Sequence, residues 1–190
     1  KELRSVFGKA SLAYKNFLYL DVTARNDWSS VFAPDLNSYF YPSVSTSFVF
    51  SEFLPATIKN AISFGKLRLA YAQVGSDVDP YRVNLQYNTS PAYGSNPSLA
   101  IGNEFRNGRL VPAKTNSFEI GTELKFLKNR IGLDFAYYVN ENKNQILGVT
   151  LNGATGYTSN LINAGDLTNR GFEFSLTGTP VQSKNVSWDL

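Results

Sequence analysis

The chain has 190 residues, of which 17% are charged and 14% aromatic, and its net charge of +3 is too small and scattered to indicate nucleic-acid binding. It contains no Cys, Met or His, which excludes disulfides, thiolate metal sites and catalytic arrangements built on His or Cys. No apolar run reaches the roughly 18 residues of a membrane helix, so any bilayer contact would involve strands. Because the chain begins at Lys1 without an initiator methionine or a signal peptide, we expect a mature portion or a fragment.

Alternating apolar and polar residues predict β-strands along most of the chain. From Leu18 onward, apolar side chains point to one face while Tyr19, Asp21 and their successors point to the other. We count about eight antiparallel strands, most of them near the 9–11 residues with which a tilted strand crosses a membrane. In chain order, the strand segments lie near residues 6–14, 18–25, 43–50, 64–74, 117–126, 133–138, 172–177 and 186–190.

Short and long connections alternate between these strands. Long loops are predicted at about 27–40, 75–114 and 141–167. The shorter connections are Lys15-Asn16, Ser51–Asn60 with one helical turn after Pro55, Lys128–Arg130 and Pro180–Asn185. Outer-membrane barrels have this alternation, with short periplasmic turns and long extracellular loops. A soluble sandwich has no physical reason to keep all its long loops at one end.

Aromatic residues gather near both ends of the predicted strands, as they do at the two interfaces of a membrane. Near the short turns are Tyr14, Phe17, Tyr19, Phe48, Phe50, Phe126 and Trp188, and near the long loops are Trp28, Tyr39, Phe40, Tyr41, Tyr71 and Tyr137. The polar face of the predicted strands carries small and charged residues, which suit a water-filled lumen. These patterns favour an antiparallel transmembrane β-barrel over a soluble β-domain, although any sheet with one wet face also alternates.

Several stretches, taken in order, resemble the barrel of SusC/RagA-family TonB-dependent outer-membrane transporters of Bacteroidota. Together they cover nearly the whole chain except the loop around residues 82–112. The stretches are TARNDWSS at 23–30, YFYPSVS at 39–45, GKLRLAYAQVG at 65–75, SFEIGTEL at 117–124, NAG at 163–165, NRGFEF at 169–174, GTP at 178–180 and SWDL at 187–190.

The resemblance implies a barrel of roughly 22 strands in the outer membrane of a Gram-negative bacterium, closed by an N-terminal plug. It also implies a SusD-like lid lipoprotein over the barrel and uptake driven through the TonB complex. Because the sequence shows neither a plug nor a TonB-contacting segment, we expect residues 1–190 to form a partial barrel domain from the later half. Open strand edges are costly in hydrocarbon, so these strands should be stable only within the closed parent barrel.

Catalysis and metal binding find little support in the sequence. Glu119 and Glu123 share a strand face but lie roughly 13 Å apart, too far for a glycosidase pair. Asp77 and Asp79 offer two carboxylates that suit Ca²⁺, but the further ligands of a calcium loop do not follow. The turn-forming residues Gly75 and Pro80 explain this segment better. We therefore expect no enzyme, no metal site and no cofactor.

The predicted wall contains arginines and isolated glycines. We expect Arg25, Arg68 and Arg170 to form wall networks with Asp21, Glu119 and Glu173. Isolated glycines within strands, such as Gly65 and Gly121, are expected to mark bends or bulges of the wall.

The long loops are where we expect ligand binding, since loops on a rigid scaffold commonly carry it. Their tyrosines can stack on sugar rings, and their amides and arginine can bond hydroxyls or peptide groups. Packing among the loops or against the lid explains any single residue at least as well. The candidate ligand-binding residues are Tyr81, Tyr93, Asn96, Arg106, Asn152 and Tyr157.

The leading hypothesis is TonB-dependent uptake of an oligosaccharide or another nutrient polymer fragment, with this chain supplying barrel wall and extracellular loops. Its expected partners are the rest of the barrel, the plug, the lid lipoprotein, the TonB complex, the lipid bilayer and an oligosaccharide or peptide ligand. The alternative is a soluble β-sandwich that binds carbohydrate. A third hypothesis, an outer-membrane enzyme, has Asp77 and Asp79 as its only candidates. The wall motifs do not distinguish a glycan from a peptide ligand.

Overall fold

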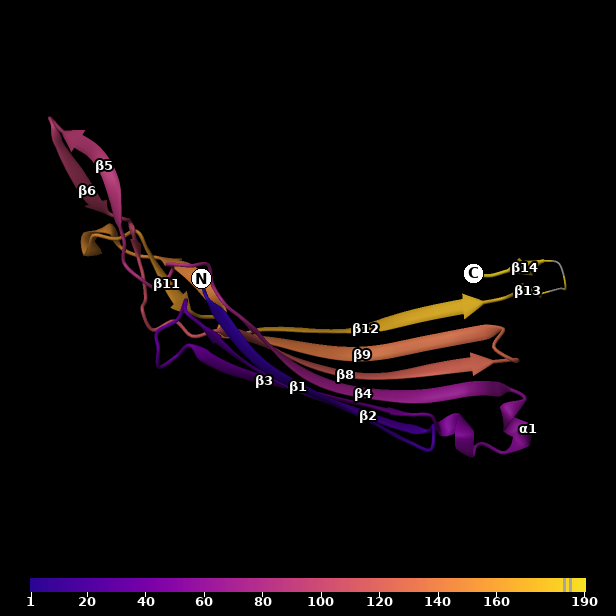
Figure 1. Cartoon of the computed structure of the whole chain (residues 1–190). Coiled ribbons are helices and arrows are strands. Elements are labelled where there is room, and N and C mark those ends of the chain that lie inside the picture. Colours follow the sequence, from indigo (N-terminus) through magenta and orange to yellow (C-terminus); the bar gives the residue numbers. More distant parts are fainter. Residues whose placement is uncertain (183, 185) are drawn as a thin grey trace.

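A computed structural model describes residues 1–182, 184 and 186–190 of the chain. A seven-stranded antiparallel sheet dominates it, in the order β1-β2-β3-β4-β8-β9-β12. Figure 1 shows this sheet as one long layer, with short turns and α1 at one end and a group of smaller strands at the other. The seven strands are β1 Leu3–Tyr14, β2 Leu18–Ser29, β3 Ser38–Phe48, β4 Ile62–Ser76, β8 Ala113–Phe126, β9 Ile131–Lys143 and β12 Leu167–Gly178.

The remaining elements are short and lie in the connections. A hairpin of β5 and β6 projects away from the other strands, and β10, β11 and β7 form a three-stranded sheet (Figure 1). The helical elements are η1 Phe50–Phe53, α1 Ala56–Lys59 and η2 Gly153–Thr155. The short strands are β5 Tyr87–Tyr93, β6 Asn96–Ile101, β7 Glu104–Phe105, β10 Ile146–Thr150, β11 Ser159–Asn163, β13 Val181–Gln182 and β14 Ser187–Trp188.

The connections differ greatly in length between the two ends of the sheet. At the end that we call the turn end, β1 meets β2 and β8 meets β9 through tight turns in which Asn16 and Asn129 have φ of 59° and 69°. Asparagine tolerates this left-handed conformation, which suits hairpin turns. The helical turn expected after Pro55 is confirmed as α1. At the opposite, loop end, the connections run over 30–37, 77–112 and 144–166.

The strand predicted at 186–190 begins a further strand beside the sheet. Gly178 and Leu190 exchange backbone hydrogen bonds of 3.1 and 2.8 Å, and β14 pairs with β13. The predicted short connection Pro180–Asn185 includes residues 183 and 185, which lie outside the described residues.

The strand register divides the sheet into an apolar and a polar face, because paired residues share a face and successive residues alternate. The apolar face includes Leu20, Val22, Val44, Leu67, Leu69, Tyr71, Phe118, Ile120, Leu124, Phe135, Tyr137, Phe172 and Phe174. The polar face includes Asp21, Thr23, Ser43, Ser45, Arg68, Glu119, Glu123, Asp134, Asn140, Glu173 and Ser175. The predicted alternation is therefore confirmed.

The apolar face is left open by the described residues. Phe172 is 71% exposed, Leu176 62% and Ile120 47%. A soluble sandwich would cover these side chains with a second sheet about 10 Å away, and within the described part of the chain no such layer exists.

Two expectations about the wall are wrong. The register places Tyr39 and Tyr41 on the polar face, so of the three aromatics at 39–41 only Phe40 is on the apolar face. Arg170 pairs with Val139 on the apolar face. Glu173, three residues further along the same strand, points to the polar face, so the two side chains cannot form an ion pair. Alternation decides both cases, because residues an odd number apart point to opposite sides of a strand.

Gly65 and Gly121 accommodate neighbouring side chains and do not mark bulges. The register runs without a shift through Gly65 and Gly121, and the one irregularity of this ladder lies between Ile62 and Phe64. At Gly65 the Phe50 ring occupies the space that a Cβ would take. Glycine at this position thus allows η1 to pack against β4.

The compact hydrophobic core lies at the loop end and not in the sheet. We call it the loop core; its members, Val31, Phe32, Val83, Leu110 and Leu161, are at most 7% exposed. They come from three connections far apart in sequence. Tyr39, Val78 and Ile146 pack against them. Packing of these side chains therefore holds the three long connections together at the loop end.

Candidate ligand-facing surface

A long ion pair crosses the polar face from β4 to β9. Arg68 donates from both terminal nitrogens to the two carboxylate oxygens of Asp134, each at 2.8 Å, in the bidentate geometry that favours arginine. The side chain passes over β8 at Gly121, where an added Cβ would lie 3.0 Å from Arg68 Nη2 and 3.1 Å from the Phe135 carbonyl oxygen. Because Gly121 has no side chain, the Arg68 side chain can cross β8, and its ion pair with Asp134 connects β4 to β9.

The neighbouring charges also pair, but not as the sequence suggested. Arg25 bonds Asp27 at 2.7 Å instead of Asp21, and the Tyr41 hydroxyl donates to the same carboxylate. Asp21 accepts instead from Ser11 on β1. Residues two apart on a strand lie roughly 7 Å apart on one face, which an arginine spans more readily than the roughly 13 Å to a residue four away.

Glu123 continues this charged row on the polar face. It pairs with Lys66 at 2.6 Å on β4 and with Lys125 at 3.4 Å on its own strand. Glu119, which was expected in the same wall network as Arg68, is not its hydrogen-bond partner; that partner is Asp134. The sheet thus presents a polar wall whose charges largely neutralise one another.

Asp77 ties the longest connection to the end of β2. It accepts from Ser29 Oγ at 3.0 Å and from Lys1 Nζ at 2.7 Å. Both of its carboxylate oxygens therefore have partners, which accounts for this residue without a metal. No group of three or more acidic residues suited to a metal ion occurs among the described residues.

A polar hollow of about 350 Å³ lies among the loops. Its charged residues are Arg82, Glu104 and Arg106; Glu104 Oε1 lies 3.4 Å from Arg82 and 3.7 Å from Arg106. The remaining lining residues are Leu85, Gln86, Asn88, Gly102, Asn103 and Ser159. With two guanidinium groups, one carboxylate and several amides, the hollow can bond hydroxyl, carboxylate or peptide groups.

Arg106 organises the rim of this hollow. Its Nη1 donates to the carbonyl oxygens of Tyr81 at 2.6 Å and Asn84 at 3.2 Å, and to Gln86 Oε1 at 3.2 Å. Tyr81 has a φ of 66°, an uncommon conformation for a non-glycine residue. Arg106 thus holds this segment through its backbone, leaving Arg82 as the more accessible cation, 41% exposed.

The six predicted ligand residues fall into three separate pairs. Arg106 and Tyr81 meet at the rim of the hollow. Tyr93 and Asn96 face each other at the tip of the β5–β6 hairpin, where Tyr93 is 86% exposed. Asn152 and Tyr157 flank η2, where Asn152 Oδ1 accepts from the backbone N–H of Ala154 at 3.0 Å. The chain does not bring all six into one site.

The pairs at the hollow and at η2 are linked. The Tyr157 ring meets the Phe105 ring edge-on at 5.2 Å between centroids, and the backbone N–H of Thr158 donates to the Asn103 carbonyl at 2.8 Å. Arg82 and Glu104 line the hollow but were not among the predicted ligand residues. Their only signal was charge in two loop segments otherwise rich in neutral residues, and only folding places them together.

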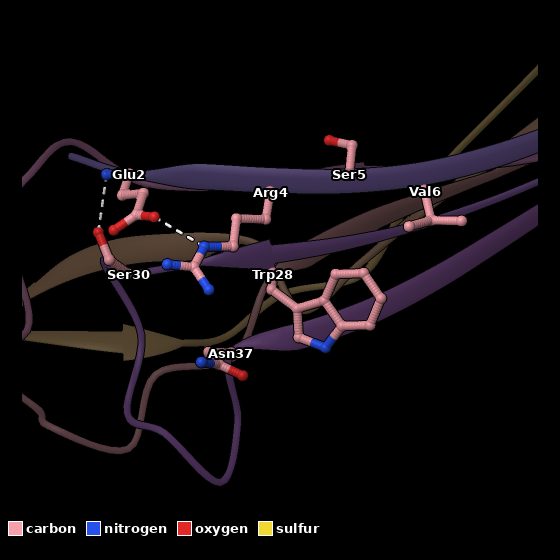
Figure 2. Close-up of a pocket in the computed structure, with 7 residues that line it drawn as sticks. All are labelled: Glu2, Arg4, Ser5, Val6, Trp28, Ser30 and Asn37. Atoms are coloured by element: carbon pink, nitrogen blue, oxygen red, sulfur yellow. Dashed lines mark hydrogen bonds and ion pairs between the residues drawn. The ribbon is translucent and has the colours of Figure 1, made fainter.

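Figure 2 shows a second and larger hollow, of about 540 Å³, at the loop end of β1. The side chains of Trp28 and Arg4 lie on the same side of the hollow, and Arg4 Nε donates to Glu2 Oε1 at 2.7 Å. None of the six predicted residues lines it. Because β1 is an edge strand here, with one row of unpaired backbone groups, a neighbouring strand of a closed barrel would lie against this region. We therefore do not take it as the ligand surface.

Residues 2–190 match the family described as TonB dependent receptor-like, beta-barrel. The chain is 34% identical over 193 residues to TonB-dependent receptor P26 of Formosa agariphila, covering 98% of this chain and 19% of that relative. It is 28% identical over 197 residues to TonB-dependent receptor SusC of Bacteroides thetaiotaomicron, covering 99% and 20% respectively. The chain thus spans about a fifth of the length of these relatives.

Solved structures show the same architecture. The RagAB peptide importer in its closed-closed state superposes with a TM-score of 0.85 at 25% identity, covering 96% of this chain and 20% of that chain. The siderophore receptor PirA of Pseudomonas aeruginosa superposes at 0.63 with 17% identity, covering 98% and 32%, which shows the fold alone. No helix among the described residues is long and apolar enough to cross a membrane.

Proposed function

Because the chain belongs to the family of TonB-dependent receptor-like β-barrels, which lie in the outer membrane of Gram-negative bacteria, we propose that it forms part of an importer of oligosaccharides or other nutrient polymers. Within that importer the seven strands supply barrel wall, and the connections at the loop end supply ligand-facing surface. The polar face would line the lumen and the apolar face would contact lipid.

The hollow around Arg82, Glu104 and Arg106 is the observation that carries the ligand-binding part of this proposal. It lies on the loops, is large enough for part of a small polymer and presents both donors and acceptors. Tyr81, whose carbonyl oxygen accepts from Arg106, and Tyr157, whose ring meets Phe105, add aromatic surface near the hollow against which a sugar ring or peptide group can stack.

The energy for uptake and the capture of the ligand would depend on partners outside the chain. By analogy with SusC and RagAB, we infer a plug and TonB complex that drive uptake and a SusD-like lipoprotein that covers the loops. We expect no catalysis, since the relatives are receptors and charged groups of the polar face such as Glu123 and Asp134 are held in ion pairs.

A peptide ligand is the second candidate, and one observation favours it. Solved structures of RagAB, a peptide importer, superpose with a TM-score of 0.85. The hollow suits either ligand, because peptide groups and sugar hydroxyls both use paired donors and acceptors.

The test is binding of defined oligosaccharides and oligopeptides to the full-length protein, purified in detergent and followed by calorimetry. Arg82→Ala removes the accessible cation of the hollow, and Arg109→Ala is its control, because Arg109 pairs with Asp35 at 3.2 Å and does not line the hollow. We expect Arg82→Ala to weaken binding about tenfold, which corresponds to a charge-assisted hydrogen bond of about 1.4 kcal/mol.

Each result of this measurement is informative. Binding of an oligosaccharide that depends on Arg82 and not on Arg109 supports glycan import, and the same dependence for a peptide supports the second candidate. Equal affinities of both variants and the wild type would rule out the hollow as the binding site. Growth of the host on the identified ligand, lost on deletion of the gene and restored by the wild-type gene, then tests import itself.

A further inference from the structure

The apolar face of β8 and β9 has a clear limit toward the loop end. With the exception of Thr122, apolar residues occupy its side of the strands from Phe118 to Phe126 and from Ile131 to Val139. With a rise of roughly 3.3 Å per residue and a tilt of about 40°, this stretch covers roughly 20 Å along the membrane normal, close to the apolar band of known barrels. What lies beyond Phe118 therefore faces the headgroups of the outer leaflet.

Polar residues replace the apolar ones beyond this limit. Asn116 and Glu141 come first as a cross-strand pair, and Lys114 and Lys143 follow as the next pair on the same face. Gln73 on β4 donates to Asn116 at 2.7 Å, which extends this polar collar across a third strand. The two lysines lie about four residues, or roughly 10 Å along the membrane normal, outside the apolar band.

Two lysines directly opposite each other on one sheet face are unfavourable, because like charges on neighbouring strands repel. Lys143 has one anionic partner, Glu141, at 3.1 Å. Within the part of the chain that the structure describes, no ion pair includes Lys114. The two lysines therefore carry one positive charge that no anionic side chain among the described residues balances, and this charge lies beyond the apolar band toward the loop end.

A hollow of about 230 Å³ opens beside Lys114. It exists because the pairing of β3 with β4 ends at Ser43 and Ala72, although both strands continue toward the loops. Pro42, the next residue of β3, has no N–H with which to continue a ladder. Phe40, Gln73 and Asn144 line the hollow together with Lys114, so it offers amide groups beside the cation. Tyr39 and Tyr41 of the polar face also line it, so the hollow lies in the gap between the two strands.

We propose that Lys114 and Lys143 bind the phosphate of an outer-leaflet lipid headgroup whose acyl chains lie along the apolar band. Charge complementarity identifies the headgroup as anionic, and the apolar residues directly below identify it as that of a lipid instead of a free ion. A phosphate between the two ammonium groups relieves their repulsion and forms charge-assisted hydrogen bonds with both. This lipid site does not depend on which ligand the barrel imports.

The test measures binding of diphosphoryl lipid A, presented in neutral detergent micelles, to the full-length protein. Dephosphorylated lipid A and inorganic phosphate are the comparison probes. Lys114→Gln with Lys143→Gln removes both charges, and we expect roughly twentyfold weaker binding, since each lysine near an anionic surface contributes a factor of about five. Lys128→Gln is the matched control, because Lys128 is an exposed lysine in the tight turn at the opposite end of the same strand pair.

The proposal requires that dephosphorylated lipid A and inorganic phosphate bind much more weakly than diphosphoryl lipid A. It also requires that Lys114→Arg with Lys143→Arg, which keeps both charges, binds within about twofold of the wild type; this variant decides the matter if the glutamine variant does not fold. Wild-type affinity of the glutamine variant, an equal loss in Lys128→Gln, or equally tight binding of inorganic phosphate would each overturn it.

Discussion

The seven-stranded sheet and the loop core are stabilised in opposite ways. In the sheet, backbone ladders and ion pairs on the polar face connect the strands, while large apolar side chains such as Phe172 and Ile120 stay exposed on the other face. In the loop core, Leu110 is fully buried among side chains from other connections. The sheet therefore depends on the bilayer to cover it, whereas the loop end carries its own hydrophobic core.

This contrast assigns different roles to the two regions. Because backbone hydrogen-bond ladders hold the wall, it keeps its shape whichever side chains line its polar face. Loops held by a small core keep a fixed hollow around Glu104, yet the β5–β6 hairpin makes few contacts outside itself. The following substitutions test the contrast, beginning with the largest expected effect.

Leu110→Ala should disrupt the loop end and leave the wall intact. Removing a fully buried leucine side chain costs about 4 kcal/mol, because a cavity remains in a core too small to close around it. Hydrogen exchange of the full-length protein should quicken over 77–112 and stay unchanged in β8. Leu99→Ala, at a position 66% exposed on the hairpin, is the control. Equal protection of 77–112 in both variants would show that the loop core does not order these loops.

Ile120→Lys should destabilise the wall although Ile120 is 47% exposed in the isolated sheet. A lysine on the lipid side near the bilayer midplane costs about 3 kcal/mol. Ser117→Lys places the same charge on the polar face of the same strand and should cost far less. Unfolding of the full-length protein by denaturant in lipid vesicles measures both. Equal losses for the two variants would contradict the assignment of the faces.

Gly121→Val tests the strand-crossing ion pair. The added side chain would collide with the Arg68 guanidinium and the Phe135 carbonyl, so we expect a loss of about 2 kcal/mol from overpacking and from the broken pair with Asp134. Gly8→Val, where no atom lies within 4 Å of the added Cβ, should change the unfolding free energy little. The prediction fails if both valines cost the same.

Asn152→Ala should have the smallest effect, which distinguishes a structural from a ligand-binding role. Asn152 Oδ1 caps η2 through Ala154 N, and losing such a cap costs about 1 kcal/mol. Hydrogen exchange around η2 should rise, and Asn152→Ser, which can also cap, should restore it. A loss of ligand binding in both variants, with exchange restored only in Asn152→Ser, would instead indicate that Asn152 contacts the ligand.

The sequence was sufficient for the seven long strands and for most of their faces, since alternation is local and the register only repeats it across neighbours. It did not predict the short strands β5, β6, β7, β10 and β11, which lie within segments expected to be long loops. Segments such as 117–126 and 172–177 alternate strictly and lie where predicted. Some assignments failed within one strand, as for Arg170 and Glu173, which point to opposite faces, and others failed between strands. Arg68 reaches Asp134 only because Gly121 lies between them, and no pattern within one strand reports which residue stands beside it.

By itself, the sequence determined the all-β class, the short and long connections and the two faces of the wall, because each follows from the chemistry of residues close along the chain. Only the tertiary structure decided which charges pair, where the loop core forms, and that Arg82 and Glu104 share a hollow with Arg106. It also decided that the six predicted ligand residues form three pairs and not one site. The reason is that the long connections 77–112 and 144–166 have no periodic pattern, so contacts among distant residues alone determine their conformation.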